Sequence, residues 1–232
     1  MYHKIAPLRR ESSVPAHYVS PAVFARQMRM LRLLGFQSVR MGDLGESPLP
    51  KRPIGITFDD GYENFLRHAL PALRANGLFG TVFLVADRLG GTNDWDEGAE
   101  RLLDAAQVRE CVAAGTEFGS HTLTHVDLPK VPEEIARCEI WESRRKLGYM
   151  LQEEVKAFCY PYGGFNDRVR GLVAEAGYRT ACSTRKGVNG PEADRLALRR
   201  INVRSDTWTF VFALKLLRSL RHAHQAPHPP GL

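Results

Sequence analysis

The chain has 232 residues, of which 44% are hydrophobic and 25% are charged, a composition that can bury the core of a single domain. The net charge is +6, but the basic residues are dispersed along the chain, which argues against a nucleic-acid-binding protein. The 4 cysteines form no CxxC pair, so we expect small buried side chains rather than a thiolate metal site, and no apolar run reaches the ~20 residues that span a bilayer.

Helix and strand patterns alternate along the chain. Residues 2–5 have strand character, and Ser20 is placed to cap a helix that begins at Pro21 and stops at Gly35. Further strands are expected at 36–39, 54–58, 81–85, 117–120, 155–160, 178–183 and 198–203. Further helices are expected from the end of the 54–58 strand to about residue 76, interrupted at Pro71, and at 104–114, 132–147, 166–176 and 206–222.

This alternation is typical of a parallel sheet covered by helices. We expect one domain over residues 1–222 and a disordered tail over 223–232, where proline and glycine are frequent. The polar, glycine-containing stretch 87–103 is expected to be a long surface loop.

Two adjacent carboxylates, Asp59 and Asp60, follow the strand expected at 54–58. Neighbouring side chains on an extended segment point in opposite directions, so the two groups should have separate roles. One carboxylate could bind a metal ion while the other remains free to accept a proton. The alternative is structural, with Asp60 capping the helix that follows.

Two histidines, His121 and His125, follow the strand expected at 117–120. Their four-residue spacing would bring both imidazoles to one side if the segment forms a helical turn. Thr122 stands where an HExxH metalloprotease helix has its glutamate, so that type of base is absent. An Asp/His/His set with open positions suits an ion that activates water, whereas the alternative is a pair of core or capping histidines.

Three motifs together resemble the polysaccharide deacetylases, the NodB-homology or carbohydrate esterase 4 family. They are Thr57–Gly61, His121–His125 and Tyr160–Gly163, and the resemblance extends over about residues 2–203. It implies a distorted (β/α) barrel of about seven parallel strands with outer helices. By the same resemblance, Asp59 is the general base, and Asp60, His121 and His125 bind one divalent metal. Two imidazoles and a carboxylate make Zn²⁺ the expected ion, with Co²⁺ or Ni²⁺ as alternatives.

The Tyr160–Gly163 motif could be a simple turn between a strand and a helix. By resemblance, Pro161 and Tyr162 instead belong to the substrate site: the backbone N–H of Tyr162 helps to stabilise the oxyanion and its ring lines the groove. The family often has an arginine two residues before this proline to orient the catalytic aspartate, but Cys159 stands there in this chain. Arg200 is the candidate replacement.

A general acid is harder to find. The Leu-x-His motif that supplies it in most of the family is absent near the C-terminus. Tyr2–His3, however, resembles the N-terminal Tyr-His of a circularly permuted branch that includes the biofilm poly-N-acetylglucosamine deacetylases. His3 is therefore expected to be the acid and to reach the site from the side opposite Asp59, whereas His17 and His68 are expected at the surface.

The sequence thus predicts a catalytic domain that removes N-acetyl groups from amino-sugar residues of a polysaccharide and releases acetate. The partner is an N-acetylated glycan whose identity the motifs do not specify. Two alternatives are a hydrolase of the same superfamily acting on a small non-sugar amide, and a non-catalytic glycan-binding module. No signal peptide is visible at the start of the chain, so we expect a cytoplasmic location unless the start is truncated.

Overall fold

A computed structural model describes residues 1–9, 11–46, 48–96 and 100–224 of the chain. A 6-stranded parallel sheet forms the centre of the fold, and its strands lie side by side in chain order from β5 to β10. The strands are β5 (Thr57–Phe58), β6 (Thr81–Leu84), β7 (Glu117–Ser120), β8 (Ala157–Cys159), β9 (Thr180–Lys186) and β10 (Leu198–Arg200). Because all strands run in one direction, their carboxyl ends meet at one rim.

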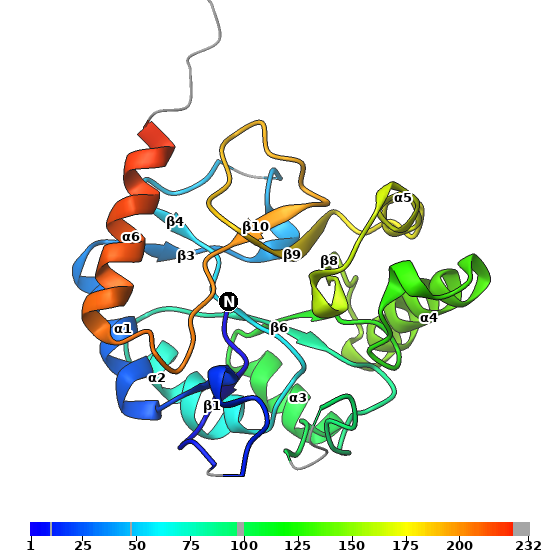
Figure 1. Ribbon diagram of the computed structural model, residues 1–232, viewed down its shortest axis with the longest axis horizontal. Coiled ribbons are helices and arrows are strands. Elements are labelled where there is room, and N and C mark those ends of the chain that lie inside the picture. Colours follow the sequence, from blue (N-terminus) through cyan, green and yellow to red (C-terminus); the bar gives the residue numbers. More distant parts are fainter. Residues whose placement is uncertain (10, 47, 97–99, 225–232) are drawn as a thin grey trace, which may run out of the picture.

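Helices lie around the outside of this sheet, while the strands and the first residue of the chain lie near the middle of the view (Figure 1). The helices are α1 (Pro21–Leu33), α2 (Leu70–Arg74), α3 (Ala105–Ala113), α4 (Glu133–Leu151), α5 (Asp167–Glu175) and α6 (Thr209–His224). A π-helix spans Phe65–Ala69, and short 3₁₀-helices span Pro15–His17, Met41–Asp43, Leu128–Lys130 and Pro161–Gly163. None of the helices in the described ranges has the length and apolarity needed to cross a membrane.

Local signals fix where three of these helices begin. The side chain of Ser20 accepts a hydrogen bond from the Val23 amide at the start of α1. Asp104 and Gln107 form a reciprocal capping box at the start of α3, and Asn166 caps α5. Each cap satisfies backbone N–H groups that the first helical turn leaves unpaired. These helix starts are therefore confirmed as predicted.

The start of the chain bridges the two edges of the sheet. The Tyr2 amide donates to the Thr57 carbonyl at 2.8 Å, and the Asp59 amide donates to the Tyr2 carbonyl at 3.0 Å, next to edge strand β5. Beyond the other edge, the Val203 amide donates to the Met1 carbonyl at 3.0 Å. An α/β architecture with a parallel, curved sheet is therefore present. The regular sheet has 6 strands, and the expected count of about seven is not confirmed.

Two short parallel pairs lie outside the main sheet. They are β1 (Lys4–Ile5) with β2 (Tyr18–Val19), and β3 (Gln37–Ser38) with β4 (Pro53–Ile54). The single strand predicted at 54–58 is thus divided between β4 and β5. Gly55 lies at the break, where an added Cβ would collide with the Met41 side chain, so a larger residue would require Met41 to move.

The helix predicted up to residue 76 is also divided. A π-helical segment at Phe65–Ala69 leads into α2, which has Pro71 in its first turn. Proline has no amide hydrogen to continue the ladder of i to i−4 bonds, so the backbone changes its winding just before it.

The buried hydrophobic residues form two clusters, a large one that includes residues of the helices and a small inner one on the sheet. The inner group consists of Met41, Phe83, Ala157, Cys159, Cys182 and Leu198. Cys111, Cys159 and Cys182 are buried as predicted, but Cys138 is exposed on α4, so that prediction was wrong for this residue. Most of the tail predicted at 223–232 lies outside the described residues.

Candidate active site

The paired aspartates lie directly after β5, at the rim where the strands end. Asp60 and Gly61 have φ angles of 74° and 77°, so the backbone turns sharply instead of remaining extended. Aspartate tolerates this left-handed conformation better than most residues, and such conformations are often found at functional sites. The carboxylates have separate partners, as expected, but the sharp turn is responsible rather than an extended strand. Asp60 caps no helix, because its carboxylate faces two histidines.

The histidine segment follows β7 but does not form a helical turn. Thr122 and His125 have φ angles of 67° and 68°, which a right-handed turn does not allow. The Glu139 carboxylate on α4 fixes the irregular segment by accepting hydrogen bonds from the Leu123 and Thr124 amides at 2.8 and 2.9 Å. It also accepts one from the Thr124 hydroxyl at 2.6 Å. The prediction of a shared side was right, but its helical explanation was wrong.

The three expected ligands converge. The Nε2 atoms of His121 and His125 each lie 3.4 Å from Oδ1 of Asp60. Three ligands about 2.1 Å from a tetrahedral ion would be about 3.4 Å apart, so this spacing fits a zinc-sized site. The Nδ1 atom of His121 lies 2.7 Å from the Cys159 carbonyl, which fixes the orientation of its ring. The Nδ1 atom of His125 is buried without a hydrogen-bond partner in the described part of the chain.

The pKa values of the two imidazoles are shifted in opposite directions. Burial lowers the pKa of both rings, but Cys159 and the hydrogen bond with Asp60 bring the pKa of His121 well above its usual value. Burial dominates at His125, whose pKa is lowered. Of the two rings, His121 is therefore the one whose surroundings favour the protonated form.

Asp59 is paired with Arg200, which comes from β10. The guanidinium donates to Oδ1 at 2.6 Å and to Oδ2 at 2.8 Å, and its Nε donates to the Ser183 carbonyl at 2.8 Å. Burial raises the pKa of Asp59, but Arg200 outweighs it and brings this pKa to about 2. The carboxylate is therefore ionised at neutral pH.

Cys159 lies where an arginine of the family often stands, and its Sγ is 3.2 Å from Arg200 Nη2. The thiol leaves space for a guanidinium that arrives from another strand. Asp59, His121 and Cys159 could in principle hold an ion as well. The Arg200 cation, however, contacts two of these three groups and disfavours a second positive charge there.

His3 lies beside Asp59 rather than opposite it. Its Nε2 is 3.9 Å from Oδ2 of Asp59, and its ring stacks on His17 with centroids 4.1 Å apart. Burial lowers the pKa of His3 to about 4, although Asp59 and Asp60 act in the other direction. The imidazole is therefore neutral at neutral pH. His17 and His68, both expected at the surface, are half-buried, and His17 packs against the His3 ring.

Pro161 and Tyr162 follow β8 in a tight turn, and Tyr162 has a φ of 57°. Pro161 is buried, while the Tyr162 ring is 56% exposed with its centroid 4.7 Å from that of His125. The ring lines a hollow of about 510 Å³ beside the metal-ligand set. The remaining residues of this hollow are His125, Val126, Asp127, Lys130 and Val131.

Sequence reasoning missed one aromatic residue of the site, Trp95. Its ring stacks on His125 with centroids 4.4 Å apart and an interplanar angle of 21°. The neighbouring Asp96 lies 3.4 Å from the Nζ of Lys4, a fully buried lysine whose cation is 5.0 Å from the Tyr62 ring. The loop expected only at the surface is thus anchored in the core. A tryptophan among polar residues at 93–96 was the available signal.

The geometry can be compared with known proteins. The sequence model described as polysaccharide deacetylase matches residues 46–181, more than half of the chain. The chain belongs to the polysaccharide deacetylase family. It is accordingly a hydrolase of amide bonds, and the matched range contains the paired aspartates, both histidines and the Pro-Tyr turn. His3 and Arg200 lie outside that range.

Individual relatives agree with this assignment. A Bacillus subtilis protein named as a polysaccharide deacetylase, YxkH, is 25% identical over 208 residues, which cover 88% of this chain and 70% of the relative. The poly-beta-1,6-N-acetyl-D-glucosamine N-deacetylase of Staphylococcus epidermidis is 27% identical over 168 residues. That match covers 68% of this chain and 57% of the staphylococcal enzyme. The Streptococcus pyogenes deacetylase PplD, solved in complex with acetate, shares the fold with a TM-score of 0.82, 24% identity and coverage of 94% and 95% of the two chains.

Proposed function

We propose that this deacetylase depends on a divalent metal and removes N-acetyl groups from amino-sugar residues of a polysaccharide, releasing acetate. Residues 1–222 would form the catalytic unit. The observation that carries the proposal is the convergence of Asp60, His121 and His125, with both histidine Nε2 atoms 3.4 Å from Asp60. The ionised carboxylate of Asp59 lies next to this set and is paired with Arg200. The relative that acts on poly-beta-1,6-N-acetyl-D-glucosamine supports an N-acetylglucosamine polymer as the substrate class.

The ligand set fits Zn²⁺ in donor type and spacing, with Co²⁺ or Ni²⁺ as alternatives. When bound, such an ion supplies a Lewis acid that makes water more acidic and polarises the acetamide carbonyl. Asp60 would provide a negatively charged ligand. His121 would provide Nε2 of a ring whose orientation is fixed by the contact of its Nδ1 with the Cys159 carbonyl.

Asp59 would accept the proton of the attacking water. Its pKa of about 2 keeps it ionised, and Arg200 holds both of its oxygens in one orientation. A base with so low a pKa is weak for proton transfer in solution. Its advantage here is a fixed position beside the ligand set, where a nearby cation also lowers the pKa of the water that must lose the proton.

Cleavage of the C–N bond leaves an amine nitrogen that needs a proton, and His3 would donate it. The ring is neutral in the free enzyme because burial lowers its pKa to about 4. Negative charge that develops on the carbonyl oxygen would raise this pKa, because a nearby opposite charge favours the imidazolium. His3, whose Nε2 lies 3.9 Å from Oδ2 of Asp59, would therefore take up the proton that Asp59 accepted from the water and pass it to the departing amine.

The substrate would lie along the hollow lined by Tyr162 and the segment after His125. Tyr162 is exposed there and meets the His125 ring at a steep angle, and Trp95 stacks on the same ring. Aromatic faces give a sugar ring apolar surface to pack against, while the Tyr162 backbone N–H would help to stabilise the oxyanion.

Acetate release provides the test. The purified protein, stripped of metal and then supplied with Zn²⁺, should release acetate from an N-acetylglucosamine oligomer, and the stripped protein should not. Asp60→Asn should remain folded but release no acetate even when Zn²⁺ is added. Equal release with and without metal would overturn the metal-dependent mechanism. Release from a small non-sugar acetamide alone would overturn the glycan assignment.

A further inference from the structure

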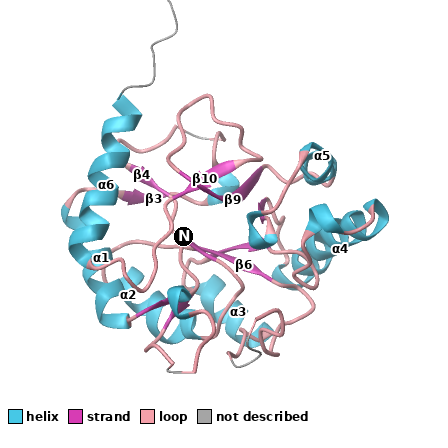
Figure 2. Cartoon of the chain, viewed as in Figure 1, coloured by secondary structure: helices cyan, strands magenta, loops and turns pink. Residues whose placement is uncertain are grey.

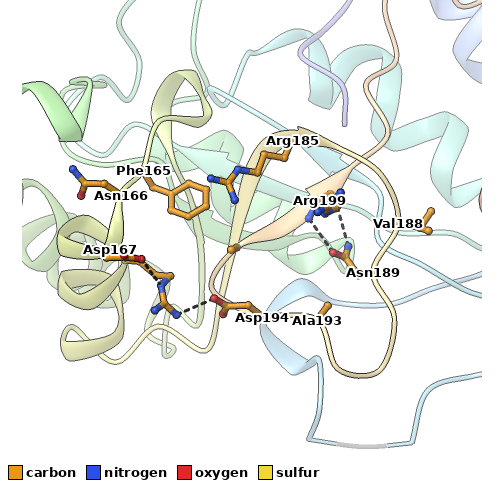
Figure 3. Close-up of a pocket in the computed structure, with 11 residues that line it drawn as sticks. Phe165, Asn166, Asp167, Arg185, Val188, Asn189, Ala193, Asp194 and Arg199 are labelled. Carbon is orange, nitrogen blue, oxygen red and sulfur yellow. Dashed lines mark hydrogen bonds and ion pairs between the residues drawn. The ribbon is translucent and has the colours of Figure 1, made fainter. Parts of the chain in front are cut away.

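A second hollow lies outside the site described above, between α5 and the connection from β9 to β10. This connection, residues 187–197, contains no helix, and loops occupy this part of the outside in Figure 2. The hollow has a volume of about 650 Å³ and is shown in Figure 3. Its lining includes three arginines, two aspartates, an asparagine and an aromatic ring, namely Arg170, Arg185, Arg199, Asp167, Asp194, Asn189 and Phe165.

Both carboxylates of the hollow are already paired with one arginine. Arg170 lies 2.8 Å from an oxygen of Asp194 and 3.9 Å from an oxygen of Asp167. Arg170 contributes +1 and the two aspartates contribute −2, so these three groups together are negative. Arg185 and Arg199 add +2 and make the formal charge of the hollow positive. Within the described ranges, neither of these two guanidiniums has a carboxylate as an ion-pair partner.

Groups without a negative charge hold the two arginines in place. The guanidinium of Arg185 lies over the Phe165 ring, 4.4 Å from its centroid. The side chain of Asn189 binds the backbone of Arg199 twice, accepting from its amide and donating to its carbonyl, each at 2.9 Å. Figure 3 shows Arg185 with Phe165 on one side of the hollow and Arg199 with Asn189 on the other. The Arg185 cation is thus held on an aromatic face, and the backbone that carries Arg199 is fixed without a charge that would neutralise its guanidinium.

The hollow shares its walls with the proposed active site. On β10, Arg200 points inward to Asp59, and its neighbour Arg199 faces outward because adjacent strand residues point to opposite faces. On β9, the Thr184 hydroxyl donates to the Tyr162 carbonyl, and the next residue, Arg185, lines the hollow. The turn after β8 places Tyr162 at one site and Phe165 at the other, and three residues span at most about 11 Å.

We propose that this hollow binds an anionic substituent, a carboxylate or a phosphate, of the glycan chain whose acetamide occupies the active site. The proposal rests on the proposed function. Arginine forks match the oxygens of carboxylates and phosphates, and Phe165 supports the Arg185 fork from below through its ring face. The active-site hollow supplies the acetamide chemistry, and the second hollow selects chains that carry acid groups nearby.

The test compares two substrates that differ only in charge: a neutral N-acetylglucosamine oligomer and the same oligomer bearing a phosphate monoester. In the zinc-loaded protein, Arg185→Gln combined with Arg199→Gln should lower the ratio of kcat/KM for the charged oligomer to that for the neutral one by about tenfold or more. Arg109→Gln, an exposed arginine on α3, is the matched control and should leave the ratio unchanged. An unchanged ratio in the double variant would overturn the proposal.

Binding measured without turnover separates this proposal from the proposed function. If calorimetry shows arginine-dependent binding of the charged oligomer although no acetate is released, the hollow is supported and the deacetylation mechanism fails. If both oligomers are deacetylated equally by the wild-type protein, the mechanism is supported and the hollow has no role in substrate choice. Inorganic phosphate is the third ligand: arginine-dependent binding of phosphate, without preference for the charged oligomer, would identify a free-anion site and overturn the glycan assignment.

Discussion

Arg200 donates hydrogen bonds from both terminal nitrogens to the Asp59 carboxylate, at 2.6 and 2.8 Å, although 141 positions separate the two residues. The Sγ atom of Cys159 lies 3.2 Å from Nη2 of the same guanidinium. The cation that pairs with Asp59 therefore comes from β10, and residue 159 on β8 supplies a neighbouring thiol.

Asp59→Asn should abolish turnover while metal affinity remains close to that of the wild type. The amide cannot accept the proton, and Asp60 rather than Asp59 faces the two histidines. We expect a loss in kcat of about 10²–10⁴-fold or more. Metal content and acetate release should be measured together. Loss of metal from this variant would show that the roles of the two aspartates are exchanged.

Arg200→Met should destabilise the protein by about 3–5 kcal/mol at pH 7, because it leaves the buried Asp59 carboxylate without its partner. The folded pKa of Asp59, about 2, is below its usual 3.8, so its favourable contribution is present above about pH 4 and is lost as the pH falls toward 2. That contribution is about 2 kcal/mol by the size of the shift. Urea unfolding of metal-free protein at pH 7 and pH 3 would measure both effects. A variant that is equally destabilised at both pH values would contradict the linkage.

His3→Ala should slow deacetylation by roughly 10²–10⁴-fold with little change in fold, if His3 is the acid. Its ring is 3.9 Å from Asp59 and stacks on His17. His17→Ala provides a control for loss of the stacked ring alone. The loss in His3→Ala should also be smaller for substrates with better leaving groups, because these need less protonation. A uniform loss across such substrates would remove His3 from the acid role.

Metal affinity should rise with pH around neutrality. The pKa of His121 is well above its usual value when no ion is present, so an ion must displace a proton from this ring. Affinity should change by up to tenfold per pH unit below that pKa and become flat above it. Calorimetric titration of Zn²⁺ in two buffers with different protonation enthalpies would count the released protons. No proton release near pH 7 would mean that His121 is neutral in the free protein.

Trp95→Ala should raise KM and lower kcat/KM by about tenfold, whereas Trp95→Phe should retain most of the activity. The indole stacks on His125 and forms part of the site, and a smaller aromatic ring preserves that packing. Trp208→Ala is the matched control, since Trp208 is 63% exposed at the start of α6. Full activity in Trp95→Ala would show that the Trp95 ring has no role in substrate binding or catalysis. Loss of metal affinity without a change in KM would show that it acts through His125.

The sequence by itself determined the features that depend on neighbours along the chain. The caps at Ser20, Asp104 and Asn166 started three helices, because their side chains bond amides within the same turn. Strand and helix patterns predicted a parallel sheet, and in such a sheet residues that follow the strands meet at one rim. That rule was enough to predict that the paired aspartates and the two histidines lie close together.

Only the tertiary structure decided which distant groups complete the site. Several residues along β9 and β10 could have faced Asp59, and the inward direction of Arg200 depends on the register of those strands. The approach of His3 depends on residues 1–2 lying between the two edges of the sheet. Trp95 reaches His125 because Lys4 and Asp96 anchor its loop. These contacts join segments far apart in the chain, and their geometry is fixed by curvature, register and packing that no local pattern encodes.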